Sequence, residues 1–172
     1  MDAAAAKAQE DVIETWQLLG PFKSSKPGKI SLEFPTPFES EFVKRGDGQI
    51  DQKAEYIVDG QAFRWTEARA EKKGKVNLGA IYGASDWSVA YGYAEIESIH
   101  ARETVLTCGS DDGIKIWLNG KVVHSHEIGR TYRANSDAVS IQLEAGINRL
   151  LVKVDNYTLG WAFGVTVPKA NF

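Results

Sequence analysis

The sequence is poor in the residues that stabilise small disulfide-rich or membrane-spanning proteins. It has one cysteine, one methionine and five prolines in 172 residues. A single cysteine cannot form an intramolecular disulfide, which excludes the disulfide-stabilised class of small domains. Its apolar runs are short, for example Leu150–Val152, whereas a transmembrane helix needs about 20 apolar residues. The sequence therefore predicts neither a disulfide framework nor a membrane span.

An excess of charge of either sign is also lacking. Lys and Arg number 20 against 23 Asp and Glu, which gives a net charge of −3 and a pI of about 5.7. Binding to nucleic acid relies on a basic surface that neutralises phosphates, and the sequence contains no basic stripe. We therefore expect no nucleic-acid partner. Residues 1–6 lack the basic start and apolar run of a signal peptide, which predicts either a cytosolic protein or one module of a longer one.

What is present favours one β-rich domain. Hydrophobic residues make up 43% of the chain and charged residues 25%, which is typical of a single globular domain. Residues 3–14 are rich in helix formers, so we expect an N-terminal arm or short helix over residues 1–14. From Trp16 onward, short aromatic and β-branched runs alternate with Gly, Pro, Asn and Asp. This pattern predicts an all-β domain over residues 15–172.

Turn residues and alternating side chains indicate how the strands are connected. Asp59-Gly60 and Asn119-Gly120 separate apolar runs and tolerate the positive φ angles of two-residue turns, so each predicts a hairpin. Residues 144–146 predict a third hairpin. Apolar side chains alternate in 87–93 and in 161–167, which indicates strands with one buried face. Without any alternation of helices and strands, we expect two antiparallel sheets packed as a sandwich.

The run Gly109–Val123 resembles the strand-turn-strand signature of PA14 domains and of galactose-binding-like jelly-roll modules. Further segments carry the same resemblance: Trp16 with 20–22, 76–78, 146–154 and 161–163. The resemblance implies a jelly-roll sandwich that serves as a noncatalytic carbohydrate-binding module. It also implies an accessory domain of a secreted bacterial carbohydrate-active enzyme, located outside the cell, at its surface or in the periplasm.

Calcium enters only through this resemblance. In PA14-type adhesins, paired aspartates at the position of Asp111 and Asp112 hold calcium and the sugar together, with further ligands from a later loop. No such later ligands are identified in this sequence, and two carboxylates supply only part of a calcium shell. The alternative interpretation is that both aspartates cap a turn by accepting backbone N–H groups.

Sugar binding by a sandwich requires flat aromatic faces and planar polar groups. The chain has 5 Trp, 6 Tyr and 7 Phe, and those within alternating runs are expected to be core residues. The predicted core aromatics are Trp16, Trp117, Trp161 and Phe163. Loops on a rigid scaffold are the usual place for a binding site. The predicted ligand-binding residues in loops are Tyr82, Trp87, Arg130, Tyr132, Asn156 and Tyr157.

Two other function classes remain open at this level. A protein-interaction module would pack against a neighbouring catalytic domain through an exposed apolar patch, for which Phe34, Phe38 and Phe42 are candidates.

A cupin-like metal enzyme would instead require His100, His124 and His126 to converge, because a metal site needs three or four ligands. No nucleophile elbow, phosphate loop or catalytic cysteine context is present, so no catalytic residue is predicted. Cys108 is expected to be a buried structural thiol.

Overall fold

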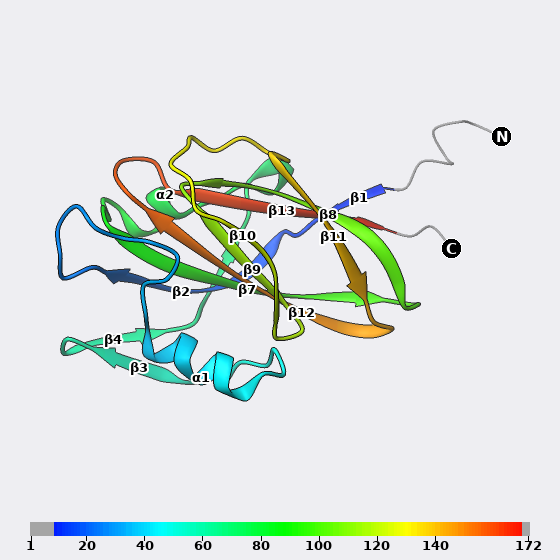
Figure 1. Ribbon diagram of the computed structural model, residues 1–172, viewed down its shortest axis with the longest axis horizontal. Helices are drawn as coiled ribbons and strands as arrows, with labels where there is room; N and C mark the ends of the chain where they lie inside the picture. Colours follow the sequence, from blue (N-terminus) through cyan, green and yellow to red (C-terminus); the bar gives the residue numbers. More distant parts are fainter. Residues whose placement is uncertain (1–8, 170–172) are drawn as a thin grey trace.

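Two antiparallel sheets form a sandwich in the computed structural model, which describes residues 9–169 (Figure 1). The first sheet has the order β1-β13-β8-β11, with β6 beside β13. The second has the order β10-β9-β12-β7-β2-β5. The predicted all-β sandwich of jelly-roll type is confirmed. Within residues 9–169, no helix is long and apolar enough to cross a membrane.

The strands of the first sheet are β1 (Gln9–Val12), β6 (Val76–Asn77), β8 (Arg102–Asp111), β11 (Asp137–Leu143) and β13 (Ala162–Lys169). Those of the second are β2 (Thr15–Lys23), β5 (Thr66–Arg69), β7 (Ser88–Ser98), β9 (Ile114–Leu118), β10 (Lys121–His126) and β12 (Gly146–Asn156). The remaining elements are helix α1 (Pro37–Arg45), the hairpin β3 (Glu55–Val58) and β4 (Gln61–Arg64), the 3-10 turn η2 (Lys72–Gly74) and helix α2 (Leu78–Tyr82).

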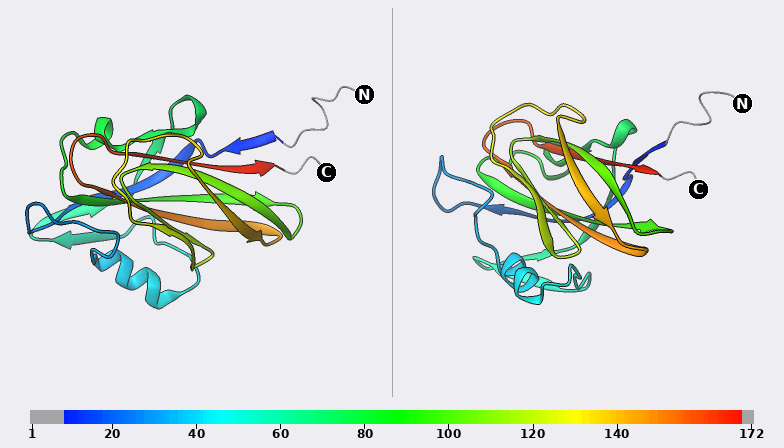
Figure 2. Two further views of the ribbon diagram at one scale, coloured as in Figure 1. Left: turned by 45° about the horizontal axis from the view of Figure 1, so that its top comes forward. Right: turned by 45° about the vertical axis from the view of Figure 1, so that its right-hand side comes forward.

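The second sheet is covered on both faces. One face packs against the first sheet, and its side chains include Val152 and Val154 of β12. The opposite face, with Leu151 of the same strand, packs under α1 and the β3–β4 hairpin. Figure 2 shows α1 and this hairpin lying together below the sandwich in both turned views. The structure therefore has two hydrophobic cores, and β12 is buried along most of its length.

Helix α1 shows why its aromatic residues do not form an exposed patch. Thr36 caps its start by accepting a hydrogen bond from the Glu39 N–H, and Gly46 ends it at φ 72°. Phe38 and Phe42 are four residues apart, so both rings lie on the same helix face and are buried in the second core. The expected exposed patch at Phe34, Phe38 and Phe42 is therefore wrong, because only Phe34 is partly exposed.

Two of the three predicted hairpins are confirmed. The turns at Asp59-Gly60 and Asn119-Gly120 have positive φ at both residues and join β3 to β4 and β9 to β10. The hairpin predicted at 144–146 is wrong. There the chain passes from one sheet to the other, since β11 pairs with β8 while β12 pairs with β7 and β9.

The start of the chain also differs from expectation. Residues 1–14 were expected to form an arm or a short helix, but Gln9–Val12 form strand β1, which pairs with β13, so the described part of this segment is not helical. Pairing with β13 of the first sheet outweighs the modest helix propensity of these residues. Residues 1–8 lie outside the described residues.

Candidate functional site

The candidate site lies at one end of the second sheet, where β7 begins and its neighbours β2 and β12 end. Ser88, the first residue of β7, pairs with Asn156 at the end of β12 and with Lys23 at the end of β2. Trp87 and Tyr157 come immediately outside this ladder, and the Trp87 N–H donates to the Tyr157 carbonyl over 2.9 Å. The sheet therefore places these two aromatic residues beside each other and beside the loop that leaves β2.

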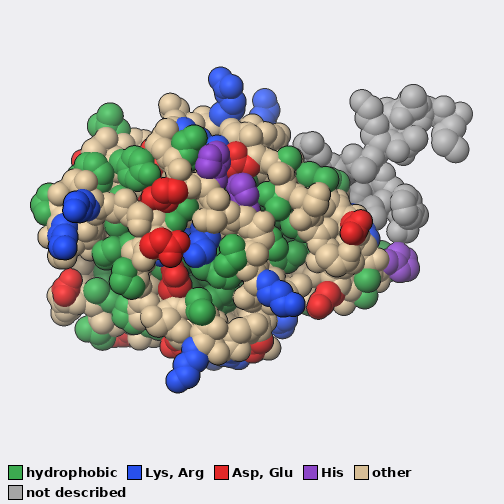
Figure 3. All heavy atoms as spheres, viewed as in Figure 1, with side chains coloured by type: hydrophobic (Ala, Val, Ile, Leu, Met, Phe, Trp, Pro, Cys, Tyr) green, Lys and Arg blue, Asp and Glu red, His purple; other side chains and the backbone are tan. Residues whose placement is uncertain are grey.

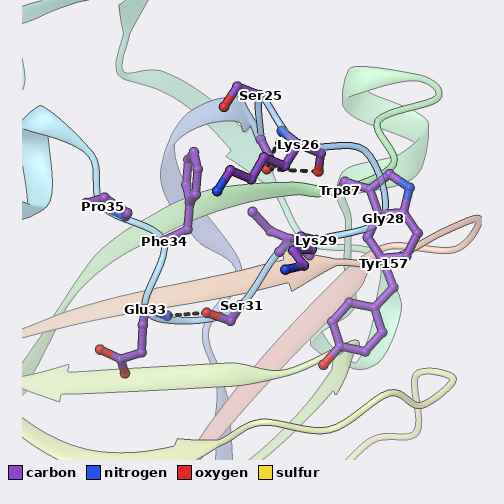
Figure 4. A pocket seen from close by; sticks show the side chains of 12 residues that line it. Ser25, Lys26, Gly28, Lys29, Ser31, Glu33, Phe34, Pro35, Trp87 and Tyr157 are labelled. Carbon is purple, nitrogen blue, oxygen red and sulfur yellow. Dashed lines mark hydrogen bonds between the residues drawn. The ribbon is translucent and has the colours of Figure 1, made fainter.

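A groove of about 680 Å³ lies at this end of the sheet. The β2–α1 loop supplies most of its wall, and Trp87 and Tyr157 complete it. The polar and charged lining residues are Ser24, Ser25, Lys26, Lys29, Ser31 and Glu33. In Figure 4, the rings of Trp87 and Tyr157 lie on one side of the groove, and Phe34 lies on the other. The groove thus combines aromatic walls with hydroxyl and ammonium groups.

Trp87 and Tyr157 form a stacked pair. Their ring centroids are 6.2 Å apart and the planes are 23° from parallel, and both side chains are partly exposed. Trp87 has φ 56°, a left-handed conformation that bulky residues seldom adopt. Backbone hydrogen bonds on both sides hold it there, since its carbonyl also accepts from the Ser24 N–H over 2.8 Å. The indole is therefore fixed by the sheet edge and by the loop wall.

Acidic residues beneath the groove anchor both of its walls. The two carboxylate oxygens of Asp112 accept the Arg130 N–H over 3.1 Å and the Tyr157 N–H over 2.7 Å. Glu127 accepts the Leu32 N–H over 3.2 Å and so holds the β2–α1 loop. Asp112 therefore caps backbone amides, as one interpretation of the sequence predicted, but these amides come from distant loops and not from its own turn.

The carboxyl groups around Asp112 are short of positive charge. Burial, and then the neighbouring Asp112 carboxylate, raise the pKa of Asp111 to about 7. Burial and then Glu127 likewise raise the pKa of Asp155. Asp155 Oδ1 accepts the Gly113 N–H over 2.7 Å, whereas its buried Oδ2 has no hydrogen-bond partner within residues 9–169. This buried acceptor is a place where a proton or a cation would be stabilised.

Arg130, predicted to bind sugar, is occupied by protein groups. Its guanidinium donates to both carboxylate oxygens of Asp137, over 2.9 and 3.0 Å, and to the carbonyl and hydroxyl of Ser110. Bidentate pairing of this kind fixes the plane of the guanidinium. Arg130 does not line the groove, and its geometry supports a cross-link between the 127–136 connection and β8 and β11.

Three other predicted ligand-binding residues lie outside the groove. Tyr82 packs on Trp161, with ring centroids 5.8 Å apart. The ring of Tyr132 lies under the Lys75 ammonium. Asn156 is buried, and its amide donates to the Ser85 carbonyl, which anchors the loop before Trp87. The structure thus brings Trp87 and Tyr157 together, and leaves Tyr82, Tyr132 and Asn156 elsewhere.

Sequence reasoning missed a charged network under the groove wall. Lys153 is fully buried, and its ammonium donates to Glu39 over 2.6 Å and to the Phe34 carbonyl over 2.7 Å. The Tyr91 hydroxyl donates to the same Glu39 oxygen over 2.9 Å. Alternation along β12 places Lys153 on the face opposite the inter-sheet core, and from the sequence alone that face would be expected to contact solvent. Only the position of α1 over that face could have revealed its burial.

The histidines do not converge as a cupin-like enzyme requires. His124 and His126 approach each other with ring centroids 6.1 Å apart, but His100 lies in the connection between β7 and β8. Among residues 9–169, the three metal-ligating side chains whose donor atoms fall within 4.8 Å of one another are Cys108, His124 and Asp137. Cys108 is buried in β8, as predicted.

Comparison with solved structures found similar folds at low sequence identity. The PA14 domain of the antifreeze protein MpAFP matches at 12% identity over 92% of this chain and 82% of its own, with a TM-score of 0.45. A family 35 carbohydrate-binding module from Clostridium thermocellum matches at 14% identity over 48% of this chain and 72% of its own, with a TM-score of 0.39.

A β-glucosidase from Kluyveromyces marxianus, solved with glucose, has a TM-score of 0.51 at 12% identity. The match covers 92% of this chain but only 17% of the β-glucosidase chain, and at this identity it shows the fold alone. The same sandwich therefore occurs as a small part of a much longer protein. No protein-family model matches the sequence, and no curated protein does.

Proposed function

We propose that this domain binds carbohydrate without catalysis, through the groove that Trp87 and Tyr157 line. The observation that supports the proposal is the stacked, partly exposed ring pair in the wall of a groove that also carries hydroxyl, ammonium and carboxylate side chains. The apolar face of a pyranose packs on flat aromatic rings, while its hydroxyl groups need donors and acceptors nearby. Lys29, Ser31 and Glu33 would supply these polar contacts. An open groove of this kind buries little area, so each module binds weakly.

We further propose that the domain is one module of a larger carbohydrate-active protein that acts outside the cell. The β-glucosidase supports this proposal, because there the same fold is a small part of a longer chain. The partner surfaces would be a polysaccharide and the neighbouring domains of that protein.

Calcium is part of the proposal at Asp111 and Asp112. The unpartnered buried oxygen of Asp155 and the raised pKa of Asp111 fit a place that lacks positive charge. Hard cations prefer several carboxylate oxygens, which Asp111 and Asp112 would provide together. The bound ion would supply positive charge beneath the groove. Asp112 would keep the Tyr157 N–H in place at the same time.

The test is native gel electrophoresis of the purified domain through gels that contain soluble polysaccharides, both neutral and acidic. We expect one class of polysaccharide to retard the domain. Tyr157→Ala should abolish the retardation, whereas Tyr157→Phe, which keeps the ring, should preserve it. Tyr82→Phe, outside the groove, is the matched control. Equal migration of the wild-type domain in every gel would contradict carbohydrate binding.

The calcium proposal is tested in the same gels and by thermal melting. A ligand that binds only the folded state stabilises it by mass action. Adding calcium to chelator-treated protein should therefore raise the melting temperature, and Asp111→Asn should remove the rise. An unchanged melting temperature in the wild-type domain would rule out calcium and would leave the aromatic groove to be judged by the gels alone.

A further inference from the structure

We propose that His124, His126, Asp137 and Cys108 form a binding site for a zinc ion. These residues lie where an edge of each sheet meets the other, away from the residues that line the groove. His124 and His126 are on β10, the edge strand of the second sheet. Asp137 begins β11, the edge strand of the first, and pairs directly with Cys108 on β8.

The spacing of the donor atoms carries the proposal. Asp137 Oδ2 lies 3.0 Å from His124 Nε2, 3.2 Å from His126 Nδ1 and 3.9 Å from Cys108 Sγ. A tetrahedral zinc ion with bonds of about 2.0 Å to nitrogen or oxygen and about 2.3 Å to sulfur separates its ligands by roughly 3.3 to 3.6 Å. The donor atoms of Cys108, His124 and Asp137 lie within 4.8 Å of one another, and His126 Nδ1, which lies next to Asp137 Oδ2, would move toward them as the fourth ligand.

The types of ligand favour zinc over calcium or magnesium. Imidazole nitrogen and thiolate sulfur are ligands of borderline and soft metals, whereas calcium and magnesium prefer oxygen alone. Two histidines, one carboxylate and one cysteine would complete four-coordination without water, and four protein ligands around the ion distinguish structural from catalytic zinc. Cys108 would release its thiol proton to solvent on binding. Both histidine side chains are partly exposed, and Figure 3 shows histidine side chains adjacent at the surface, so an ion can enter.

Arg130 holds the carboxylate in place for this role. Its guanidinium donates to Asp137 Oδ1 over 2.9 Å and to Oδ2 over 3.0 Å, which fixes the plane of the carboxylate while Oδ2 also faces the two imidazoles. Partners of a metal-ligating carboxylate orient it in this way. With Asp137 and a Cys108 thiolate as ligands, two negative charges balance the zinc ion, and Arg130 adds one positive charge beside the site. The ion would join β10 of one sheet to β8 and β11 of the other.

The test compares zinc binding and thermal melting in the purified, chelator-treated domain. Zinc at about 100 times its dissociation constant should raise the melting temperature by roughly 5 to 10 °C. Either His124→Ala or His126→Ala should weaken zinc binding by more than the roughly 10-fold to 100-fold lost when an outer partner of a ligand is removed. His100→Ala, which removes an exposed histidine elsewhere, should bind zinc as the wild type does.

A second measurement identifies the sulfur ligand and does not depend on stability. The domain loaded with cobalt should show thiolate-to-cobalt charge-transfer absorption, and Cys108→Ser should lose it.

The proposal is overturned if zinc leaves the wild-type melting temperature unchanged. It is equally overturned if His100→Ala weakens binding as much as His126→Ala does. Absence of the charge-transfer band from the wild type would contradict the four-ligand site. Because none of these residues lines the groove, failure here leaves carbohydrate binding untouched.

Discussion

Trp87 and Tyr157 are held in the groove by different means. Trp87 is fixed through its own backbone, which bonds to Ser24 and to Tyr157 on either side. Tyr157 is fixed through its amide, which donates to buried Asp112. Burial, and then the Asp155 carboxylate, raise the pKa of the Tyr157 hydroxyl to about 12, so it stays a neutral donor at physiological pH. The rings are therefore presented in fixed positions, which limits the entropy lost on binding.

The buried carboxyl group of Asp155 makes the stability of the fold depend on pH. Burial, and then Glu127, raise its pKa from 3.8 to about 8 in the folded protein. Between about pH 4 and 8 the folded state therefore holds a proton that the unfolded state has lost, and stability falls as the pH rises. Asp155→Asn keeps the oxygen that accepts the Gly113 N–H but cannot ionise. We therefore expect the free energy of unfolding of chelator-treated Asp155→Asn, relative to wild type, to rise by more than about 1 kcal/mol between pH 4 and pH 8.

Denaturant unfolding at a series of pH values measures this difference. The control is Asp86→Asn, which changes an exposed aspartate in the loop before Trp87. Its free energy of unfolding should fall with pH as steeply as that of the wild type. If Asp155→Asn has the same slope as wild type, Asp155 does not retain its proton in the folded state.

At the scale of elements, a buried ion pair attaches α1 to the second sheet. Lys153 of β12 reaches Glu39 of α1 and the carbonyl of Phe34 at the groove wall. Burial lowers the pKa of Lys153, while the hydrogen bond to Glu39 opposes that shift. A charge left without its partner in such a place is strongly unfavourable. The pair therefore links the position of the helix to the shape of the groove.

Lys153→Met should destabilise the domain by roughly 3–5 kcal/mol, because Glu39 then stays behind without its cation. Adding Glu39→Gln to this variant should restore part of the loss. Lys115→Met removes a lysine whose partner, Glu33, is exposed, and should cost about 1 kcal/mol or less. Chemical denaturation measures all three. Equal losses from Lys153→Met and Lys115→Met would show that the buried pair contributes no more than a surface pair.

Across the whole molecule, the sequence predicted the sandwich better than its outer layer. The alternation in 161–167 and the turn at Asn119-Gly120 are local signals, and both were confirmed. The turn at 144–146 was misassigned because turn chemistry says nothing of which strand the chain joins next. The burial of Phe38 and Phe42, two candidates for an exposed patch, has no local sequence signal, because they belong to a second core on the far face of a sheet.

The sequence identifies individual residues of the candidate site, but it does not show which loops come together. Loop aromatics identified Trp87 and Tyr157 as candidates, and the structure brings them together. The order of β2, β7 and β12 decides which loops meet, and it cannot be read from single segments. The chemistry of Arg130 suits sugar binding, but its donors are taken up by Asp137 at the start of β11 and by Ser110 in β8. The sequence does not show that these two strands lie next to Arg130.

Carbohydrate binding at the groove depends most on the Trp87 indole, which we expect to contact the sugar and to add little to the core. The most direct measurement is the retention of Trp87→Ala by the polysaccharide that retards the wild-type domain, together with its melting temperature. We predict retention weakened at least about 10-fold, as for the loss of an aromatic hot spot, with a melting temperature within a few degrees of wild type. Undiminished retention of a folded Trp87→Ala would show that the polysaccharide does not bind at the Trp87 indole.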